Sequence, residues 1–250
     1  MEHHYSILYG PVNKVLIRVL GEPPEGYLQL MGAHEGDVFW LPDHVIMAMC
    51  VVSLLALVLV PVKRSLSVEK PGRLQHLLEL LVGGMGDMIE SEIGHGQVKR
   101  FMPFLLTLAL FIFTCNIFGL FFFIQPPTAN TSTTFALSVM AFIVYNYVGI
   151  KDNGLIKYLK HFMGPMPALA IIMVPIEIIS HLARILSLAV RLFGNIFGEH
   201  TATGIFVSMV PFVVPWPMMG LGVFGSLLQT FIFIMLTMAY IQGAVGHEEH

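Results

Sequence analysis

Two stretches of the chain have no ionisable side chain, and they limit the folds that it can adopt. Residues 101–150 and 201–246 contain no Asp, Glu, Lys, Arg or His. Each stretch is long enough for two membrane passes, since one pass needs about 20 apolar residues. Of the 250 residues, 56% are hydrophobic and only 12% are charged, against about 25% charged in a typical soluble domain. The sequence therefore predicts an all-α protein that crosses a membrane several times.

We expect five spanning helices, at residues 45–62, 101–124, 133–150, 168–210 and 218–244. Residues 73–93 differ, because their apolar positions recur at helical spacing while carboxylates occupy many of the other positions. This pattern predicts an amphipathic helix that lies at a surface or against a partner. The turn-forming residues 125–130 predict a break outside the hydrocarbon, and three prolines within residues 211–217 predict a second break.

The basic residues predict the orientation. Nine of the 13 lie on one side of the expected spans, whereas Lys14 and Arg18 lie on the other. The nine are Lys63, Arg64, Lys70, Arg73, Lys99, Arg100, Lys151, Lys157 and Lys160. Because basic residues gather on the cytoplasmic side, we expect residues 1–44 to be an extracytoplasmic segment and residues 45–250 to form a membrane domain with a cytoplasmic C-terminus.

Composition and motifs exclude several function classes. The formal net charge of −3 argues against a polybasic nucleic-acid binder. Glycine-rich phosphate loops, Ser/His/Asp sets and metal-ligand spacings are absent from the sequence. Cys50 and Cys115 lie in apolar runs, as small buried apolar residues do. We therefore expect no cofactor, no metal, no nucleic-acid partner and no enzyme chemistry in this chain.

Ionisable side chains reappear in the expected helix at residues 168–210, where they are costly in lipid and typical of a functional site. Together with two other residues they occupy seven positions that follow one another at intervals of three or four residues. On a helix these positions stay within roughly 40° of one line. The positions are Glu177, His181, Arg184, Leu188, Arg191, Asn195 and Glu199, of which only one is apolar. One face of this helix is thus a polar stripe, on which Arg191 lies about 21 Å from Glu177 and about 12 Å from Glu199.

The residue types of the stripe suit ion transfer. Arginine keeps its charge, so Arg191 is suited to be a fixed electrostatic gate, while carboxylates and histidines bind and release protons.

His200 points about 100° away from Glu199 on a regular helix and so faces elsewhere. Gln229 in the last span is equally suited to hydrogen-bond the stripe or to hold two helices together. Three glycines of that span favour close helix approach, Gly220, Gly222 and Gly225. An alternative interpretation is that the stripe residues only satisfy one another inside a helix bundle.

Residues 191–197 (RLFGNIF) closely resemble the signature of subunit a of F-type rotary ATP synthases, the stator subunit that faces a rotating ring. Weaker likenesses to the family occur in residues 126–130 with 133 and 134, in residues 228–233 and in residues 239–241. These segments stand along the chain in the same order as in the family. The resemblance implies that Arg191 is the essential arginine between two aqueous half-channels, through which protons reach and leave a ring carboxylate. It also implies that the last two helices lie strongly tilted along the ring, and that the complex makes ATP whereas this chain does not.

The same resemblance assigns the other site residues. It places Glu177, Ser180 and His181 on the cytoplasmic half-channel, and Asn195, Glu199, His200, Gln229 and Asn116 on the outer one. Many family members carry Ala-Gly-Glu or Ala-Gly-His after the asparagine, whereas this chain has Gly-Glu-His at residues 198–200. Either Glu199 or His200 is therefore the outer relay. Gly119 occupies the position of a carboxylate found in some members, which leaves Asn116 as the nearby polar candidate.

The expected partners are c-ring subunits, the b subunits of a peripheral stalk and lipid, in a bacterial inner membrane. The choice between proton and sodium is open. A secondary transporter with the stripe as its substrate site is an alternative, but such folds show paired repeats with broken helices in both halves, and here one helix carries the ionisable groups. A structural anchor would not explain charges kept at mid-membrane.

Overall fold

The computed structural model describes residues 8–24, 28, 31, 39–67, 71–120, 125–154, 158, 170–209 and 215–245. Every regular element in these ranges is a helix. In chain order they are α1 (Tyr9–Leu20), α3 (Asp43–Arg64), α4 (Arg73–Glu92), α5 (Val98–Phe118), the short 3₁₀ helix η1 (Pro127–Ala129), α6 (Thr131–Asn153), α8 (Ala170–Met209) and α9 (Pro215–Val245).

Five of these helices, α3, α5, α6, α8 and α9, are long and apolar enough to cross a membrane. The prediction of an all-α polytopic membrane protein is thus confirmed, and each observed helix differs from its predicted span by a few residues. Helix α3, for example, begins at Asp43 after Pro42, where an acidic side chain in the first turn is favoured by the helix dipole. Residues 121–124, 168, 169 and 210, which we included in spans, lie outside the described residues.

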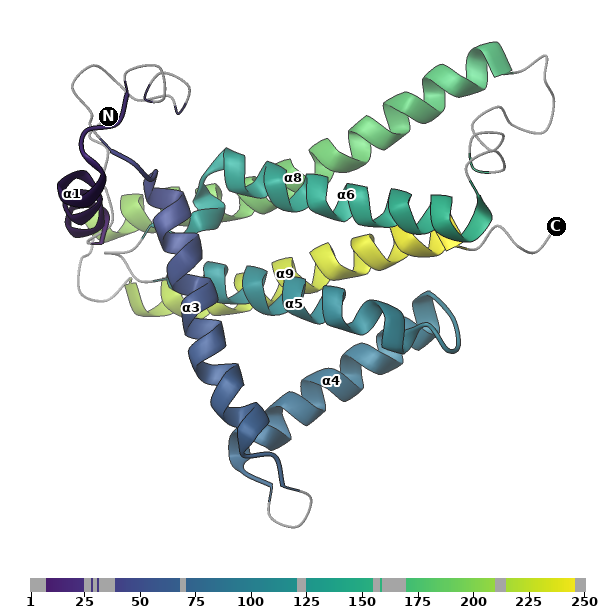
Figure 1. Ribbon diagram of the computed structural model, residues 1–250, viewed down its shortest axis with the longest axis horizontal. Coiled ribbons are helices and arrows are strands. Elements are labelled where there is room, and N and C mark those ends of the chain that lie inside the picture. The colour runs from purple at the N-terminus through teal and green to yellow at the C-terminus, as the bar shows by residue number, and fades with distance from the viewer. Residues whose placement is uncertain are drawn as a thin grey trace.

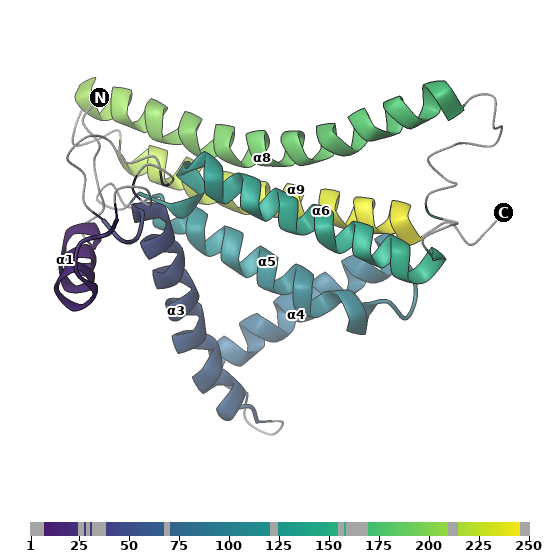
Figure 2. The same cartoon turned by 45° about the horizontal axis from the view of Figure 1, so that its top comes forward.

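Four of the long helices form one packed bundle. Helices α5, α6, α8 and α9 run side by side, whereas α3 crosses the end of the bundle at a steep angle and α4 returns from its tip (Figures 1 and 2). Helix α6 packs on both α8 and α9, and α5 packs on α9. Buried apolar side chains from all four helices form a single core, with Ile112, Leu137, Leu192 and Met238 among them.

Polar contacts tie together one end of this bundle. The Arg100 guanidinium at the start of α5 donates to both carboxylate oxygens of Asp152 at the end of α6, at 2.6 and 2.8 Å. The Asn153 side chain then donates to the carbonyl oxygen of Ala244 at the end of α9, at 2.8 Å. These three helix ends therefore lie on one side of the bundle, as the predicted orientation requires.

The break predicted at residues 125–130 is present but is not a loop in open solvent. Pro126, Pro127 and Thr128 are buried, and η1 packs against α3, α6 and α8. The backbone is satisfied locally by bonds such as Ala129 N–H to the Pro126 carbonyl, and the Asn130 side chain caps α6 by accepting from the Ser132 N–H at 2.9 Å. Irregular backbone is tolerated at membrane depth when protein covers it in this way.

Two further features differ from the sequence prediction. Helix α1 was not predicted, although Val12, Val15, Leu16 and Val19 follow helical spacing. It is held by the buried Asn13, whose Oδ1 accepts from the N–H groups of residues 40 and 41 at 2.9 and 3.1 Å.

The second proline-rich break is shorter than predicted, because the last two of its prolines, Pro215 and Pro217, lie in the first turn of α9. The first turn of a helix tolerates proline, since its N–H groups have no partner within the helix.

Helix α6 approaches its neighbours most closely at Gly149. A Cβ there would lie 2.6 Å from the Tyr158 ring and 3.3 Å from Ala244. We therefore expect Gly149→Ala to destabilise the fold by about 1–3 kcal/mol, as overpacking does. Gly83→Ala is the control, because a Cβ at Gly83 meets nothing within 4 Å and alanine favours a helix. The midpoint of thermal unfolding in detergent should fall for the first variant only, and equal midpoints would contradict this packing.

Candidate functional site

Helix α8, which carries the polar stripe, is the least covered span. Only 11% of its most apolar window is buried, against 33% for α9. The stripe follows the border between the covered and the open face of α8. His181 and Leu188 are buried, whereas Arg191 and Asn195 are exposed. The stripe residues therefore do not share one environment. The stripe turns slowly around α8, and only one side of that helix is packed against the bundle.

Arg191 faces away from the bundle. Its neighbours Val190 and Phe197 expose 53% and 58% of their surface, while Leu192 on the other side is fully buried. No ion pair or hydrogen bond of Arg191 is present within the described parts of the chain. The one permanent charge near the middle of this span thus lies on an apolar outer surface and has no anion from the described chain.

Glu199 and His200 line one cavity of about 140 Å³, at the end of α8 that is nearer to α1. The other walls are Gly119 and Leu120 after α5, Thr203 and Gly204 of α8, and Met218 and Met219 of α9. Our expectation that His200 faces elsewhere is therefore wrong. The two side chains do diverge on α8, but α5 and α9 diverge from it as well, so the space between these helices receives both.

Of the three glycines of α9 named above, Gly222 is the one that lets it approach the stripe closely. The Glu199 carboxylate lies against Gly222, and its Oε2 is 3.9 Å from the position that a Cβ on Gly225 would occupy. Asn195 Nδ2 is 4.0 Å from that same position. Nothing lies within 4 Å of a Cβ on Gly220. The prediction of close helix approach is thus confirmed at Gly222. A Cβ on Gly225 would be in ordinary van der Waals contact, and one on Gly220 would meet no described atom.

Three of the residues predicted for the outer half-channel carry a buried polar atom that has no hydrogen-bond partner among the described residues. These atoms are Asn116 Nδ2, His200 Nε2 and Gln229 Nε2. Asn116 does accept a hydrogen bond from the Thr128 hydroxyl at 3.2 Å through its Oδ1. Buried donors and acceptors without a partner are costly, so water molecules are the expected partners along this side of α8.

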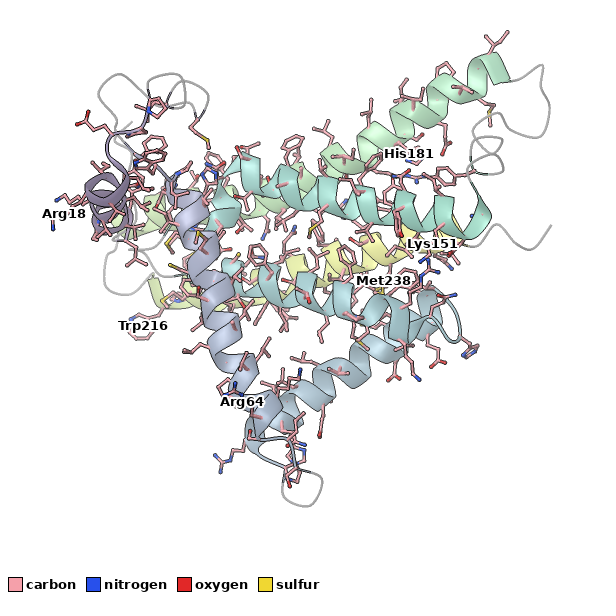
Figure 3. All side chains as sticks on the ribbon, in the orientation of Figure 1. Arg18, Arg64, Lys151, His181, Trp216 and Met238 are labelled. Carbon is pink, nitrogen blue, oxygen red and sulfur yellow. The ribbon has the colours of Figure 1, made fainter. Side chains whose placement is uncertain are left out.

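A second polar cluster lies nearer the opposite end of α8. Glu177 Oε1 is 3.4 Å from His181 Nε2, and the other ring nitrogen of His181 is 2.7 Å from the Tyr145 hydroxyl of α6. His181 lies between α8 and α6 (Figure 3). Arg184 does not pair with Glu177; its guanidinium lies 5.4 Å from the centre of the Tyr240 ring. Ser180 is half-buried on the same turn of α8.

Tyr145 is a site residue that sequence reasoning missed. It is 2% exposed, stacks on His181 with ring centres 5.8 Å apart, and contacts Tyr240 of α9. A signal was present, because Tyr145 and Asn146 are polar residues in a span without charges. The neighbouring Tyr158 hydroxyl donates to Asn146 Oδ1 at 2.7 Å. Burial raises the pKa of Tyr158, which keeps this hydroxyl protonated and able to donate.

Apolar packing separates the two polar clusters. Between Glu177 and Glu199, the covered face of α8 presents Leu188, Ala189 and Leu192, which are at most 2% exposed. These residues meet the apolar core formed by α5, α6 and α9. On α8, therefore, buried apolar side chains separate the cluster around His181 from the cavity at Glu199.

Known proteins resemble this chain over most of its length. Residues 44–242 match the profile of the ATP synthase A chain family. A protein named ATP synthase subunit a from Geotalea daltonii is 41% identical over 220 residues, which cover 87% of this chain and 93% of that protein. A protein of the same name from Aliarcobacter butzleri is 39% identical over 226 residues, which cover 90% of this chain and 97% of that protein. Another from Geobacter sp. strain M21 is 47% identical over 178 residues, which cover 71% of this chain and 76% of that protein. Because the match reaches from α3 to α9 at such identities, the chain belongs to the ATP synthase A chain family.

Proposed function

We propose that this chain conducts protons between two half-channels that open on opposite sides of the membrane and meet near Arg191. A carboxylate on a rotating ring of c subunits takes up a proton from one half-channel and releases it into the other after rotation. The complex makes ATP elsewhere, and this chain itself catalyses no reaction. The observation that carries the proposal is the exposed guanidinium of Arg191, which has no anionic partner within the described chain.

An unpaired arginine at the centre of a membrane helix is costly, by about 2.5–3.5 kcal/mol on insertion scales. A carboxylate supplied by another chain would offset this cost, and the poorly covered face of α8 leaves room for one. Arginine does not release its proton, so Arg191 cannot carry protons itself. It instead favours the ionised form of a carboxylate that passes it, which makes the ring carboxylate release its proton before it goes by.

The apolar packing around Leu188 and Leu192 supports two separate half-channels rather than one pore. In this proposal a proton that enters at Glu199 does not pass through the core to His181, so it leaves the chain to cross. The ring carboxylate provides that route at the outer face of α8. Rotation is then required for net flow, which is how proton transfer becomes coupled to mechanical work.

The cavity at Glu199 is the proposed outer half-channel. His200 lines this cavity, and Asn116 and Gln229 carry further buried polar atoms without a partner among the described residues, so all three are suited to hold a file of water molecules. We propose Glu199 as the relay, because its carboxylate lies beside Asn195, one turn from Arg191 on the same side of α8. His200 then binds water at the wall formed by Gly119, where its Nε2 is 3.2 Å from the position of a Cβ.

The cluster of Glu177, His181 and Tyr145 is the proposed cytoplasmic half-channel. Glu177 is 28% exposed and lies nearest the mouth, whereas His181 is 10% exposed. Histidine can pass a proton between its two ring nitrogens, and both nitrogens of His181 have a partner here. Ser180 lies at the same level and would add a hydroxyl to this path.

The remaining expectations complete the proposal. The basic residues beside Arg100 and at the tip of α3 mark the cytoplasmic side, so residues 1–44 and the Glu199 cavity lie on the outer side of a bacterial inner membrane. Helices α8 and α9 have 40 and 31 residues, more than a perpendicular crossing needs. We therefore propose that they lie strongly tilted along the ring, while the b subunits of a peripheral stalk bind elsewhere on the chain.

Loss of the charge at position 191 provides the main test of the gate. In the assembled complex, Arg191→Ala should abolish ATP-driven proton pumping, because the ring carboxylate would no longer be made to release its proton. Arg184→Ala is the matched control, since its guanidinium is packed over Tyr240, and it should keep most of the pumping. Acidification of vesicles measured by a fluorescent dye reports both results, and retained pumping by Arg191→Ala would refute the gate.

The two residues of the outer cavity can be separated in the same way. Glu199→Gln should slow proton entry from the outer side by about a hundredfold, the usual value of a positioned proton-transfer group. His200→Gln should have a much smaller effect, and Thr203→Val, on the same cavity wall, should have almost none. Passive proton flux through complexes stripped of their catalytic sector measures this. A larger effect at His200 would exchange the two roles, and negligible effects at both would exclude this cavity as the entry path.

A further inference from the structure

Helices α3, α4 and α5 form the sides of a wedge (Figures 1 and 2), which residues of α9 also line. It contains a cavity of about 490 Å³ whose walls are almost entirely apolar. Helix α4 contributes Leu74, Leu77, Leu78, Leu81, Met85 and Met88. Leu74 and Leu77 are lining residues and yet expose 57% and 54% of their surface. The apolar face of this amphipathic helix is therefore only partly covered by its own chain.

The wedge has the depth of one lipid leaflet. Its wall on α3 runs from Leu55 to Val62, in the half of the helix that ends at Arg64. Nine residues separate Leu55 from Arg64, which is about 14 Å of helix. Half of a bilayer's hydrocarbon core is about 15 Å thick. The cavity thus extends from one membrane surface to about the middle of the membrane.

Three basic residues lie at the end of the wedge where α3 meets α4. Lys63 and Arg64 follow directly after the lining residue Val62, and Arg73 directly precedes the lining residue Leu74. Figure 3 places Arg64 where α3 meets α4. All three are exposed, and none has an ion pair within the described parts of the chain. Arg100, on the same side of the bundle, is by contrast paired with Asp152.

We propose that this wedge is a binding site for an anionic phospholipid. An acyl chain fills the apolar cavity, and Lys63, Arg64 and Arg73 bind the phosphate. Three unpaired cations favour an anionic headgroup over a zwitterionic one, by about fivefold for each basic residue near the surface. The lipid holds α4 against α3 and α5, and the site is independent of the proton path.

Photolabelling of the purified ATP synthase complex tests this proposal. The two probes are phosphatidylglycerol and phosphatidylcholine with the same photoactivatable acyl chain, and the labelled peptides of this chain are identified by mass spectrometry. We expect the phosphatidylglycerol probe to label residues of α3, α4 and α5 that line the wedge, at least about tenfold more than the other probe. Equal labelling by the two probes, or labelling only outside the wedge, would overturn the proposal.

Two sets of variants separate the headgroup from the acyl chain. The triple variant K63Q/R64Q/R73Q should lose the preference for phosphatidylglycerol, whereas K99Q/K151Q, which removes two basic residues elsewhere on that side, should keep it. Leu78→Trp, which fills the cavity, should reduce labelling by both probes, and Leu80→Trp should not, because Leu80 is 74% exposed and does not line the cavity. An unchanged preference in the triple variant, or unchanged labelling of Leu78→Trp, would refute the site even if another variant fails to assemble.

Discussion

In the proposed function, the structure depends on one constraint, which is that Arg191 keeps a positive charge within the membrane, where water is scarce. A charge in this place needs an anion, and the described chain directs the guanidinium outward instead of providing one. This requires α8 to leave that face uncovered, and it explains why α8 is the least buried of the five candidate spans. The bundle of α5, α6 and α9 supports α8 from behind, so the polar stripe lies where a partner can reach it.

The dry packing at Leu188 and Leu192 is the necessary complement of that charge. If the cavity at Glu199 were joined through the core to the cluster at His181, protons would cross without moving anything. A unit charge that crosses 100 mV releases about 2.3 kcal/mol, so several protons are needed for each ATP and leakage would be wasteful. Gly222 has a related role, because it lets α9 pack against the Glu199 carboxylate.

Much of this arrangement could be predicted from the sequence, because a membrane imposes strong rules on composition. Stretches without charges predict the spans. Seven positions that follow one another at intervals of three or four residues predict the stripe. The direction of His200 could not be predicted, since the angle between two residues on one helix does not show where neighbouring helices diverge. Tyr145 was missed for a similar reason, because its partner lies on another helix. Helix α1 was missed because its pattern is short and its main anchor, Asn13, is polar.

The most direct test of two separate half-channels is to ask from which side of the membrane each level of α8 can be reached. Single cysteines are placed at positions 177, 188 and 199 in complexes whose Cys50 and Cys115 are replaced by serine. A membrane-impermeant thiol reagent is then applied to either side of sealed vesicles. A cysteine at 199 should react only from the outer side, a cysteine at 177 only from the cytoplasmic side, and one at 188 from neither. Reaction of any of these positions from both sides would contradict the account, because it would require a continuous aqueous path through the chain.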